Sequence, residues 1–299
     1  MDPREFYKRV SGALPLERLW GKRVAVVGLG SGGSRVAAEL GRLGIDLLLI
    51  ERPGERLEEH NIVRHLLGFE SLGKLKLDEV TRFIANLNPS TRVSPCGLDV
   101  VDEPERLAQT LEEWPPDLIA VCMDNEPSKH VLNDLALGLG VPQVGAGVYD
   151  GGIGGEAYVA RPGGACYGCI ADHLRLHQFG PTQHSSPDYN HLHSPEIPST
   201  CALNLDIEQI ALLQSRLALD LLLGSNSLTG IPPEVNLCVF ANRVVPGTFP
   251  RPLHCEFYCI RRRKDCLNCG ECPSDLEQES ARILADLQTA PSQTPLASG

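Results

Sequence analysis

Residues 28–33 read Gly28-Leu29-Gly30-Ser31-Gly32-Gly33, which matches the pattern G-x-G-x-x-G. The motif follows a short β-branched run at 23–27 and opens a segment with apolar residues at helical spacing, 34–43. Glycines let the backbone approach a phosphate, and the N-terminus of the following helix supplies N–H groups and a positive dipole end. The motif predicts a phosphate-binding loop, for which a tight strand-to-helix turn without a ligand is the structural alternative.

Outward from this loop, strands alternate with helices. An apolar run at 45–50 completes a strand–helix–strand unit. Similar patterns follow, alternately helical and strand-like, at 75–87, 118–122, 128–139 and 142–145. Elements that alternate in this way predict a Rossmann-like α/β fold, with a mostly parallel sheet and helices on both faces.

After Gly145 the pattern changes. Glycine-rich turns at 151–155 and alternating residues at 156–160 predict antiparallel strands, and apolar residues nearly all round 206–223 predict a buried helix. Two further strand-like runs lie at 235–240 and 253–260. The sheet is therefore expected to be extended by antiparallel strands.

Composition limits the possible partners. The chain has 299 residues, 42% hydrophobic content and a formal net charge of −11, so it can bury a normal core but offers no basic surface for nucleic acid. Neither a signal-peptide pattern at the N-terminus nor an apolar run near the roughly 20 residues of a membrane span is seen. We expect a cytoplasmic protein that binds neither nucleic acid nor membrane.

An acidic residue, Glu51, ends the second strand about twenty residues beyond the glycine loop, where a carboxylate can bind ribose hydroxyls. On the loop and Glu51 alone, an NAD-dependent oxidoreductase would be the leading interpretation. The charged residues further along the chain favour a different one.

Three of these positions have the side chains that adenylation chemistry needs. Attack of a carboxylate on the α-phosphate of ATP requires cations that hold the triphosphate and a carboxylate for Mg²⁺. Arg64 lies in Asn61-Ile62-Val63-Arg64, Lys76 begins a helical pattern, and Asp124 follows a strand. Since ligands of α/β sheets bind at the carboxyl ends of parallel strands, Asp124 is expected at the binding edge.

With these motifs the chain resembles the ThiF/MoeB/HesA family, whose fold is shared with ubiquitin-activating enzymes, over roughly residues 21–270. The resemblance implies that the pocket glycines bind nucleotide, that Asn61 and Arg64 contact phosphates, that Lys76 stabilises the adenylation transition state and that Asp124 binds Mg²⁺. The pocket glycines are Gly28, Gly30 and Gly33. Where the family usually has D-x-D, this chain has Glu51 and Glu55, which we assign to the ribose and to the metal region.

Two C-x-x-C pairs, Cys166 with Cys169 and Cys266 with Cys269, together offer four thiolates for tetrahedral Zn²⁺. Such a site would tie the middle of the chain to its end and leave no open coordination position. Other nearby thiols are Cys255, Cys259 and Cys272, so the fourth ligand is not unique, and reduced or redox-active thiols without metal are the alternative. We favour Cys266 and Cys269, and the resemblance likewise implies a structural zinc.

Cys201 ends a long polar stretch and precedes the predicted buried helix. A thiol near a helix N-terminus can act as a nucleophile, and many relatives of the family carry on this crossover loop the cysteine that takes the activated carrier. A buried small apolar residue is the alternative role. We therefore predict that Cys201 is a candidate acceptor.

The sequence as a whole predicts an ATP-dependent adenylyltransferase that acts on the C-terminal carboxylate of a ubiquitin-like or sulfur-carrier protein, with Mg²⁺, a structural Zn²⁺ and a homodimeric state. The alternatives are an NAD-dependent oxidoreductase and a nonenzymatic carrier-binding scaffold. The expected organisation is a helical N-terminal segment, an adenylation domain that contains the crossover loop, and a partly disordered tail. Their ranges are 1–20, 21–273 with the loop at 171–201, and 274–299.

Overall fold

The computed structural model describes residues 2–177, 201–224 and 227–271. Its strands are β1 (Arg23–Val27), β2 (Asp46–Glu51), β3 (Val93–Gly97), β4 (Leu118–Val121), β5 (Gln143–Val148), β6 (Gly154–Ala160), β7 (Leu237–Ala241) and β8 (His254–Tyr258). Its α-helices are α1 (Pro3–Phe6), α2 (Ser31–Arg42), α3 (Glu59–Ile62), α4 (Lys76–Leu87), α5 (Pro104–Glu113), α6 (Glu126–Leu139), α7 (Tyr167–His177) and α8 (Asn204–Leu223). Short 3-10 turns are η1 (Leu16–Arg18), η2 (Phe69–Ser71) and η3 (Asp150–Gly152).

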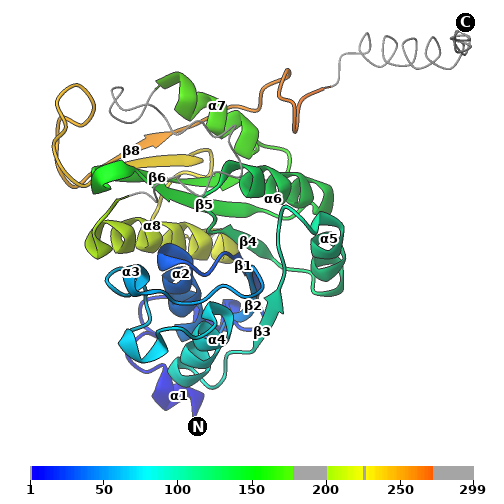
Figure 1. Ribbon diagram of the computed structural model, residues 1–299. Helices are drawn as coiled ribbons and strands as arrows, with labels where there is room; N and C mark the ends of the chain where they lie inside the picture. Colours follow the sequence, from blue (N-terminus) through cyan, green and yellow to red (C-terminus); the bar gives the residue numbers. More distant parts are fainter. Residues whose placement is uncertain (1, 178–200, 225–226, 272–299) are drawn as a thin grey trace, which may run out of the picture.

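These strands form one sheet in the order β3-β2-β1-β4-β5-β6-β7-β8 (Figure 1). Neighbouring strands from β3 to β5 pair in parallel, whereas β6, β7 and β8 pair antiparallel. The fold class predicted from the sequence is confirmed. Strand β3 and helix α5 are elements that the sequence analysis did not anticipate.

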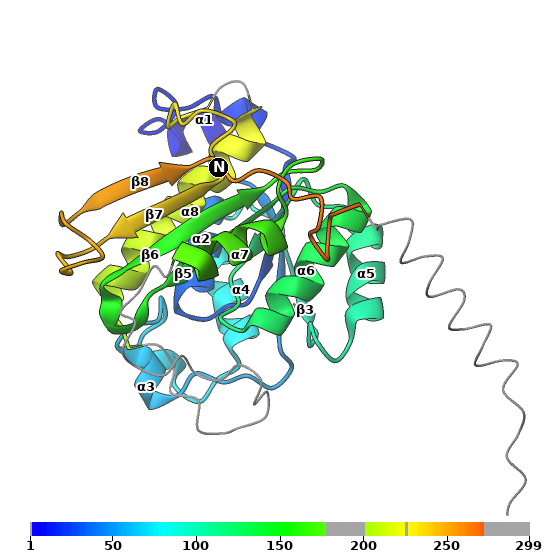
Figure 2. The same cartoon turned by 90° about the horizontal axis from the view of Figure 1, so that it is seen from above.

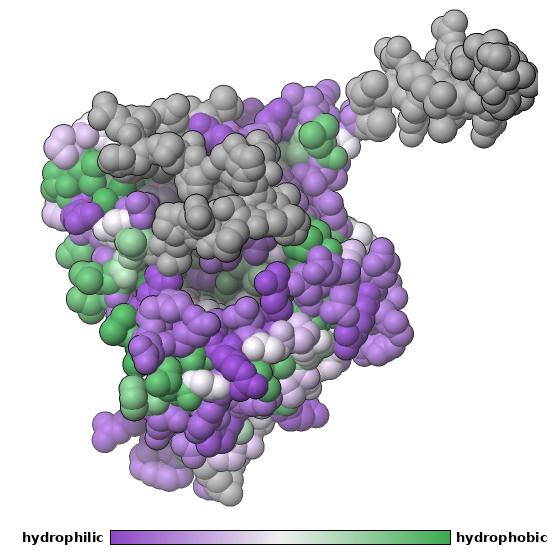
Figure 3. All heavy atoms as spheres, viewed as in Figure 1, coloured by the Kyte–Doolittle hydropathy of each residue, from purple (hydrophilic) through white to green (hydrophobic). Residues whose placement is uncertain are grey.

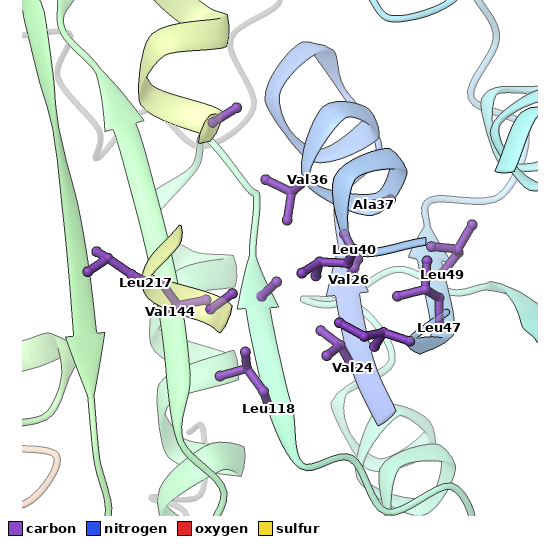
Figure 4. Close-up of a cluster of buried hydrophobic side chains, with 14 of the residues drawn as sticks. Val24, Val26, Val36, Ala37, Leu40, Leu47, Leu49, Leu118, Val144 and Leu217 are labelled. Atoms are coloured by element: carbon purple, nitrogen blue, oxygen red, sulfur yellow. The ribbon is translucent and has the colours of Figure 1, made fainter. Parts of the chain in front are cut away.

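Helices cover both faces of the sheet (Figure 2). One face packs against α2, α4 and α8, and the other packs against α5 and α6. Figure 4 shows the first of these layers, in which Val24 and Val26 of β1 meet Val36 and Leu40 of α2, while Leu217 of α8 lies over β5. All of these side chains are at most 6% exposed, so the glycine loop between β1 and α2 is anchored on both sides by a dry core.

The carboxyl ends of the parallel strands lie at one edge of the sheet because β1, β2 and β4 are in register. Val27 pairs with Ile50 and with Val121, so the segments after these three residues leave the sheet side by side. Those segments carry the glycine loop, Glu51 and Asp124. The topology thus brings residues far apart in sequence to one place, where α/β folds bind ligands.

Helix α7 extends into the stretch that the sequence predicts as a crossover loop. It continues to His177, so the first residues of the stretch 171–201 are helical. The polar positions 178–200 and the predicted tail, 274–299, lie outside the described residues. Within the described ranges, no helix has the length and apolar character needed to cross a membrane.

Most of the face drawn in Figure 3 is hydrophilic, and hydrophobic residues gather at its left side, near the β7–β8 end of the sheet. Exposed apolar side chains on these elements include Val244 and Leu253 in the connection and Phe257 on β8. This end of the sheet therefore exposes apolar area beside an otherwise polar surface.

Candidate nucleotide and metal sites

The glycine loop has the close contacts that require glycine at two of its three motif positions. Gly28 has φ +92°, and a Cβ there would lie 2.7 Å from the carbonyl oxygen of Cys122. A Cβ on Gly33 would lie 1.9 Å from the carbonyl oxygen of Gly28, so α2 can approach the loop only without a side chain. Gly30 is the N-cap of α2 and provides no side-chain cap, so the first-turn N–H groups have no side-chain partner from the N-cap, as at helix N-termini that bind phosphate.

Leu29, between the first two glycines, is held by two side chains. Its N–H donates to Oε2 of Glu51 at 2.6 Å, and its carbonyl oxygen lies 2.9 Å from Nε2 of His65. Leu29 and His65 are buried, with 0% and 6% of their surface exposed. The backbone of the loop is thus fixed by residues from β2 and from the segment after α3.

Burial raises the pKa of Glu51 above its ordinary value, while hydrogen bonds from the N–H groups of Leu29 and Arg52 and the nearby Lys76 act in the opposite direction. Glu51 therefore lies at the end of β2 as predicted, but its carboxylate already accepts a hydrogen bond from the loop. A ribose hydroxyl would have to share this carboxylate with Leu29.

Lys76 and Glu55 form an ion pair beside this loop. The Nζ of Lys76 lies 2.9 Å from Oε2 of Glu55, and the main chains of the two residues are also hydrogen-bonded, N to O, at 2.9 Å. The Lys76 side chain is only 15% exposed. A lysine held in this way is fixed in position at the first residue of α4, and Glu55, assigned to the metal region from sequence, is its partner.

Asn61 and Arg64 lie on and just after the short helix α3. The Oδ1 of Asn61 accepts a hydrogen bond from the N–H of Glu58 at 3.0 Å, so its side chain caps the helix. Arg64 is half-buried and directly precedes His65, whose ring contacts the glycine loop. Their predicted phosphate contacts stay predictions.

Asp124 is exposed at the edge where β4 ends. The N–H of Cys122 donates to the carbonyl oxygen of Val27 at 2.8 Å, which ties the end of β4 to the start of the glycine loop. Asn125 then caps α6, because its Oδ1 accepts from the N–H of Ser128 at 2.9 Å. An exposed carboxylate between a fixed strand end and a capped helix is a suitable ligand for Mg²⁺.

The four cysteines of the two C-x-x-C pairs come together as predicted. The Sγ atoms of Cys166 and Cys266 are 3.6 Å apart, as are those of Cys169 and Cys269, and all four lie within 4.8 Å of one another. Zn–S bonds of about 2.3 Å in a tetrahedron place sulfur atoms about 3.8 Å apart, so the cluster fits Zn²⁺.

The four cysteines differ in how their surroundings act on the thiol. Burial raises the pKa of Cys166 and raises that of Cys169 to about 11. Burial also acts to raise the pKa of Cys266, but the N–H groups of Cys269 and Asn268 and the neighbouring thiols lower it to about 7. The N–H of Arg263 lies 3.4 Å from Sγ of Cys169. Cys259, one of the alternative ligands, is exposed and not in the cluster, and Cys272 lies outside the described residues.

A tyrosine connects the cysteine cluster to the start of α6. The hydroxyl of Tyr167, which stands between Cys166 and Cys169, donates to both carboxylate oxygens of Glu126 at 2.8 and 2.9 Å. Glu126 begins α6, two residues after Asp124, and also pairs with Lys129. A hydrogen bond therefore connects the helix that follows Asp124 to the helix that carries Cys169.

Cys201 is exposed and stands before the N-terminus of α8. Its N–H donates to Oδ1 of Asp150, just after β5, at 3.1 Å. The alternative role as a buried small residue does not apply to this exposed position, whereas its role as acceptor stays a prediction.

Sequence reasoning missed His65. The only signal was its position directly after Arg64, and a histidine next to a motif is ordinarily a surface or core residue. Its contact with Leu29, 36 positions earlier, depends on how the segment after α3 folds back onto the loop.

A family model described as the ThiF family matches residues 6–243. The chain is 28% identical over 162 residues to ubiquitin-like modifier-activating enzyme 5 of Drosophila virilis, which covers 51% of this chain and 40% of that protein. It is also 28% identical over 156 residues to the SAMP-activating enzyme E1 of Haloferax volcanii, covering 51% and 54%, respectively. For the adenylyltransferase and sulfurtransferase uba4 of Aspergillus fumigatus, 28% identity over 162 residues covers 51% and 32%. The chain thus spans about a third to about half of the length of these relatives.

Solved structures share the fold at low identity. Escherichia coli MccB with ATP has a TM-score of 0.64 at 17% identity, covering 85% of this chain and 68% of that chain. MccB with AMPCPP and MccA has a TM-score of 0.66 at 17% identity, covering 90% and 75%. The family match spans most of the sequence and includes the glycine loop, Lys76 and Asp124, and therefore the chain belongs to the ThiF family.

Proposed function

We propose that this protein uses ATP to adenylate the C-terminal carboxylate of a ubiquitin-like or sulfur-carrier protein. The observation that carries the proposal is the half-buried Lys76–Glu55 pair beside the glycine loop, at the carboxyl edge of the parallel strands. A loop that binds phosphate does not by itself separate NAD from ATP. A fixed lysine beside it supports chemistry at a phosphate group.

In this reaction a carboxylate oxygen of the carrier attacks the α-phosphorus of ATP, the bond to the β-phosphate oxygen breaks, and pyrophosphate leaves. The N–H groups at the start of α2 bind phosphate oxygens, while Lys76 and Arg64 offset the negative charge that develops. Mg²⁺, when bound through Asp124, would neutralise phosphate charge. The products are an acyl-adenylate and pyrophosphate.

The relatives support a choice of acceptors to test. Their names describe activation of ubiquitin-like modifiers, activation of SAMP, and adenylyl and sulfur transfer, and a fold relative was solved with MccA. Protein carriers with a free C-terminus are thus the first substrates to test, and a short peptide is the second. Association of two copies into a homodimer is part of the proposal, and light scattering after size-exclusion chromatography tests it.

A second step is proposed at Cys201. Its thiolate attacks the carbonyl carbon of the acyl-adenylate, AMP leaves, and a thioester joins the carrier to the enzyme. The exposed position of Cys201 before α8 supports this role. Cys201→Ser should keep adenylation but lose a carrier adduct that thiol reagents cleave, and an adduct that persists in this variant would rule out Cys201.

The experiment for the first step is ATP–pyrophosphate exchange with a panel of ubiquitin-like proteins and C-terminal peptides. Lys76→Ala should lower carrier-dependent exchange by roughly 100-fold or more, because a charge-stabilising donor is lost. Lys74→Ala is the matched control: this lysine is two positions away, half-exposed, and pairs with Glu79 at 3.7 Å. Asp124→Ala should also lower exchange, with a smaller deficit at high Mg²⁺.

The outcomes distinguish the alternatives. Retention of NAD by the purified protein, without ATP binding, would favour an oxidoreductase. ATP binding without exchange for any acceptor in the panel would favour a nonenzymatic scaffold. Equal exchange in wild type and in Lys76→Ala would remove Lys76 from the mechanism.

A further inference from the structure

His65 makes two hydrogen bonds, in one of which a ring nitrogen must donate and in the other of which a ring nitrogen must accept. Its Nδ1 lies 3.1 Å from the backbone nitrogen of Leu67, and its Nε2 lies 2.9 Å from the carbonyl oxygen of Leu29. A backbone N–H can only donate and a carbonyl oxygen can only accept. The ring must therefore be neutral, with its proton on Nε2.

The same residue of the glycine loop is held from its other side. The N–H of Leu29 donates to Oε2 of Glu51 at 2.6 Å, so both polar backbone groups of Leu29 are paired with side chains. These bonds lie between Gly28 and Gly30, where the backbone would otherwise have the freedom of two glycines. They fix the first turn of the loop, while Gly30, the N-cap of α2, places no side-chain cap on the N–H groups that would meet a phosphate.

We propose that His65 is a positioning residue for nucleotide binding, which holds the glycine loop in its phosphate-binding shape through the carbonyl oxygen of Leu29. The proposal rests on the proposed function, because it concerns the same nucleotide. His65 does not touch the phosphates; its effect passes through Leu29. Loss of its hydrogen bond lets the loop adopt other conformations. ATP must then order the loop when it binds, which lowers the affinity for ATP.

The electrostatic environment keeps the ring neutral. Burial lowers the pKa of His65 below its ordinary value, and the cations Lys76 on α4 and Arg35 on α2 lower it further, while the Leu29 carbonyl acts in the opposite direction. Arg35 also donates to the carbonyl oxygen of His65 at 3.4 Å, and Glu51 faces the same loop residue. A doubly protonated ring would set an N–H of Nδ1 against the N–H of Leu67, so acid should break the arrangement.

Glutamine and alanine at position 65 separate positioning from mere packing. A glutamine amide has a donor for Leu29 and an acceptor for Leu67, but it does not titrate, whereas alanine has neither group. His60→Ala is the matched control, because His60 is also a histidine of this segment but its side chain is 64% exposed. Folding of each variant is checked by circular dichroism and by its zinc content.

The test is the dissociation constant for MgATP, measured by titration calorimetry without any carrier at pH 8.0, 7.0 and 6.0. We expect His65→Gln to bind within about threefold of wild type at pH 8.0 and His65→Ala to bind about tenfold more weakly, the equivalent of about 1.4 kcal/mol. The ratio of the wild-type constant to that of His65→Gln should stay constant from pH 8.0 to 7.0 and rise only below pH 6.5, because the pKa of His65 lies under that value; protonation of ATP itself cancels in this ratio.

Equal affinities for glutamine, alanine and wild type would overturn the proposal while leaving adenylation intact. So would a glutamine variant as weak as alanine. A wild-type protein that binds no MgATP would overturn the role of His65 and the proposed function together.

Discussion

Gly33 is the residue at which one added methyl group has the largest expected effect. A Cβ there would lie 1.9 Å from the Gly28 carbonyl oxygen and 2.8 Å from Cβ of Cys122, so the loop or α2 must move. We expect Gly33→Ala to lower the free energy of unfolding by about 3 kcal/mol, as for other overpacked sites, when measured by urea denaturation.

Gly32→Ala is the control for this substitution. A Cβ at Gly32 meets nothing within 4 Å, and alanine favours a helix over glycine by up to about 1 kcal/mol. This variant should therefore be as stable as wild type or more so. Equal losses of stability in the two variants would contradict the packing argument.

His65 also gives a prediction for stability against pH. Since its folded-state pKa lies below the ordinary value of 6.5, the unfolded chain binds the proton first as the pH falls. The contribution of His65 is thus fully present above about pH 6.5 and is lost progressively below it. Urea denaturation at pH 7.5, 6.5 and 5.5 should show a smaller decline for His65→Gln than for wild type, and parallel curves would contradict this assignment.

At the scale of single residues, the sequence indicated which side chains to consider for the site but not which other side chains they contact. Gly28, Glu51, Lys76 and Asp124 were found because a motif or the end of a strand marks them. The pairing of Lys76 with Glu55 depends on the turn that brings residues 55–57 against 73–76, and no local periodicity records that turn.

Among the elements, α2 and α4 are locked together by one asparagine. The Nδ2 of Asn88 donates to the carbonyl oxygen of Gly41 at 3.0 Å and to the hydroxyl of Tyr7 at 2.6 Å, and its Oδ1 accepts from the N–H of Ser90. Asn88 is 0% exposed, so its partners lie away from water. The end of α4, the end of α2 and the N-terminal segment thus meet at a single side chain.

Replacing Asn88 by alanine should lower the free energy of unfolding by about 2 to 4 kcal/mol, because buried polar groups lose their partners. Asn86→Ala, an exposed asparagine on the same helix, should change it by less than about 0.5 kcal/mol. The two variants are compared by urea denaturation with unchanged m-values. A loss below about 1 kcal/mol for Asn88→Ala would show that water replaces the side chain there.

Periodicity predicted the buried elements and missed the less regular ones. Strand β3 contains Pro95 and Gly97 at the edge of the sheet, so it lacks the continuous apolar run of β1 or β2. Helix α5 buries only Leu107 and Leu111 and is otherwise polar. Helix α7 begins inside the Cys-x-x-Cys knuckle, where turn-like residues hide its start.

At the scale of the whole molecule, the cysteine cluster joins the start of α7 to the segment that ends at position 269. Purified protein should contain about one zinc ion per chain, because four thiolates complete a tetrahedral site. Cys266→Ser should lose this zinc and melt about 10 °C lower or more, whereas Cys259→Ser, at an exposed cysteine, should do neither. Metal analysis and thermal denaturation decide the point, and full zinc content in Cys266→Ser would exclude it as a ligand.

Global organisation was the part of the fold that sequence predicted best. Alternation of strands and helices led to a parallel sheet, and the change after Gly145 led to antiparallel strands, since each depends on regular local patterns. The order of the strands and the joining of the two C-x-x-C pairs to one centre depend on contacts across about a hundred positions. The metal-binding chemistry of four thiols, and not the spacing of the two C-x-x-C pairs, suggested that the pairs meet at one centre.

The Tyr167–Glu126 hydrogen bonds connect the cysteine cluster to the helix that follows Asp124, and any coupling of the two candidate metal positions through them is reciprocal. If zinc at the knuckle favours the conformation in which α6 presents Asp124, then MgATP must favour retention of zinc by the same factor. Nucleotide should therefore slow the release of zinc to a chelator, and Tyr167→Phe should weaken that protection while both ions still bind. In a cell, bound nucleotide would then slow the loss of zinc, and a shortage of zinc would lower the affinity for nucleotide.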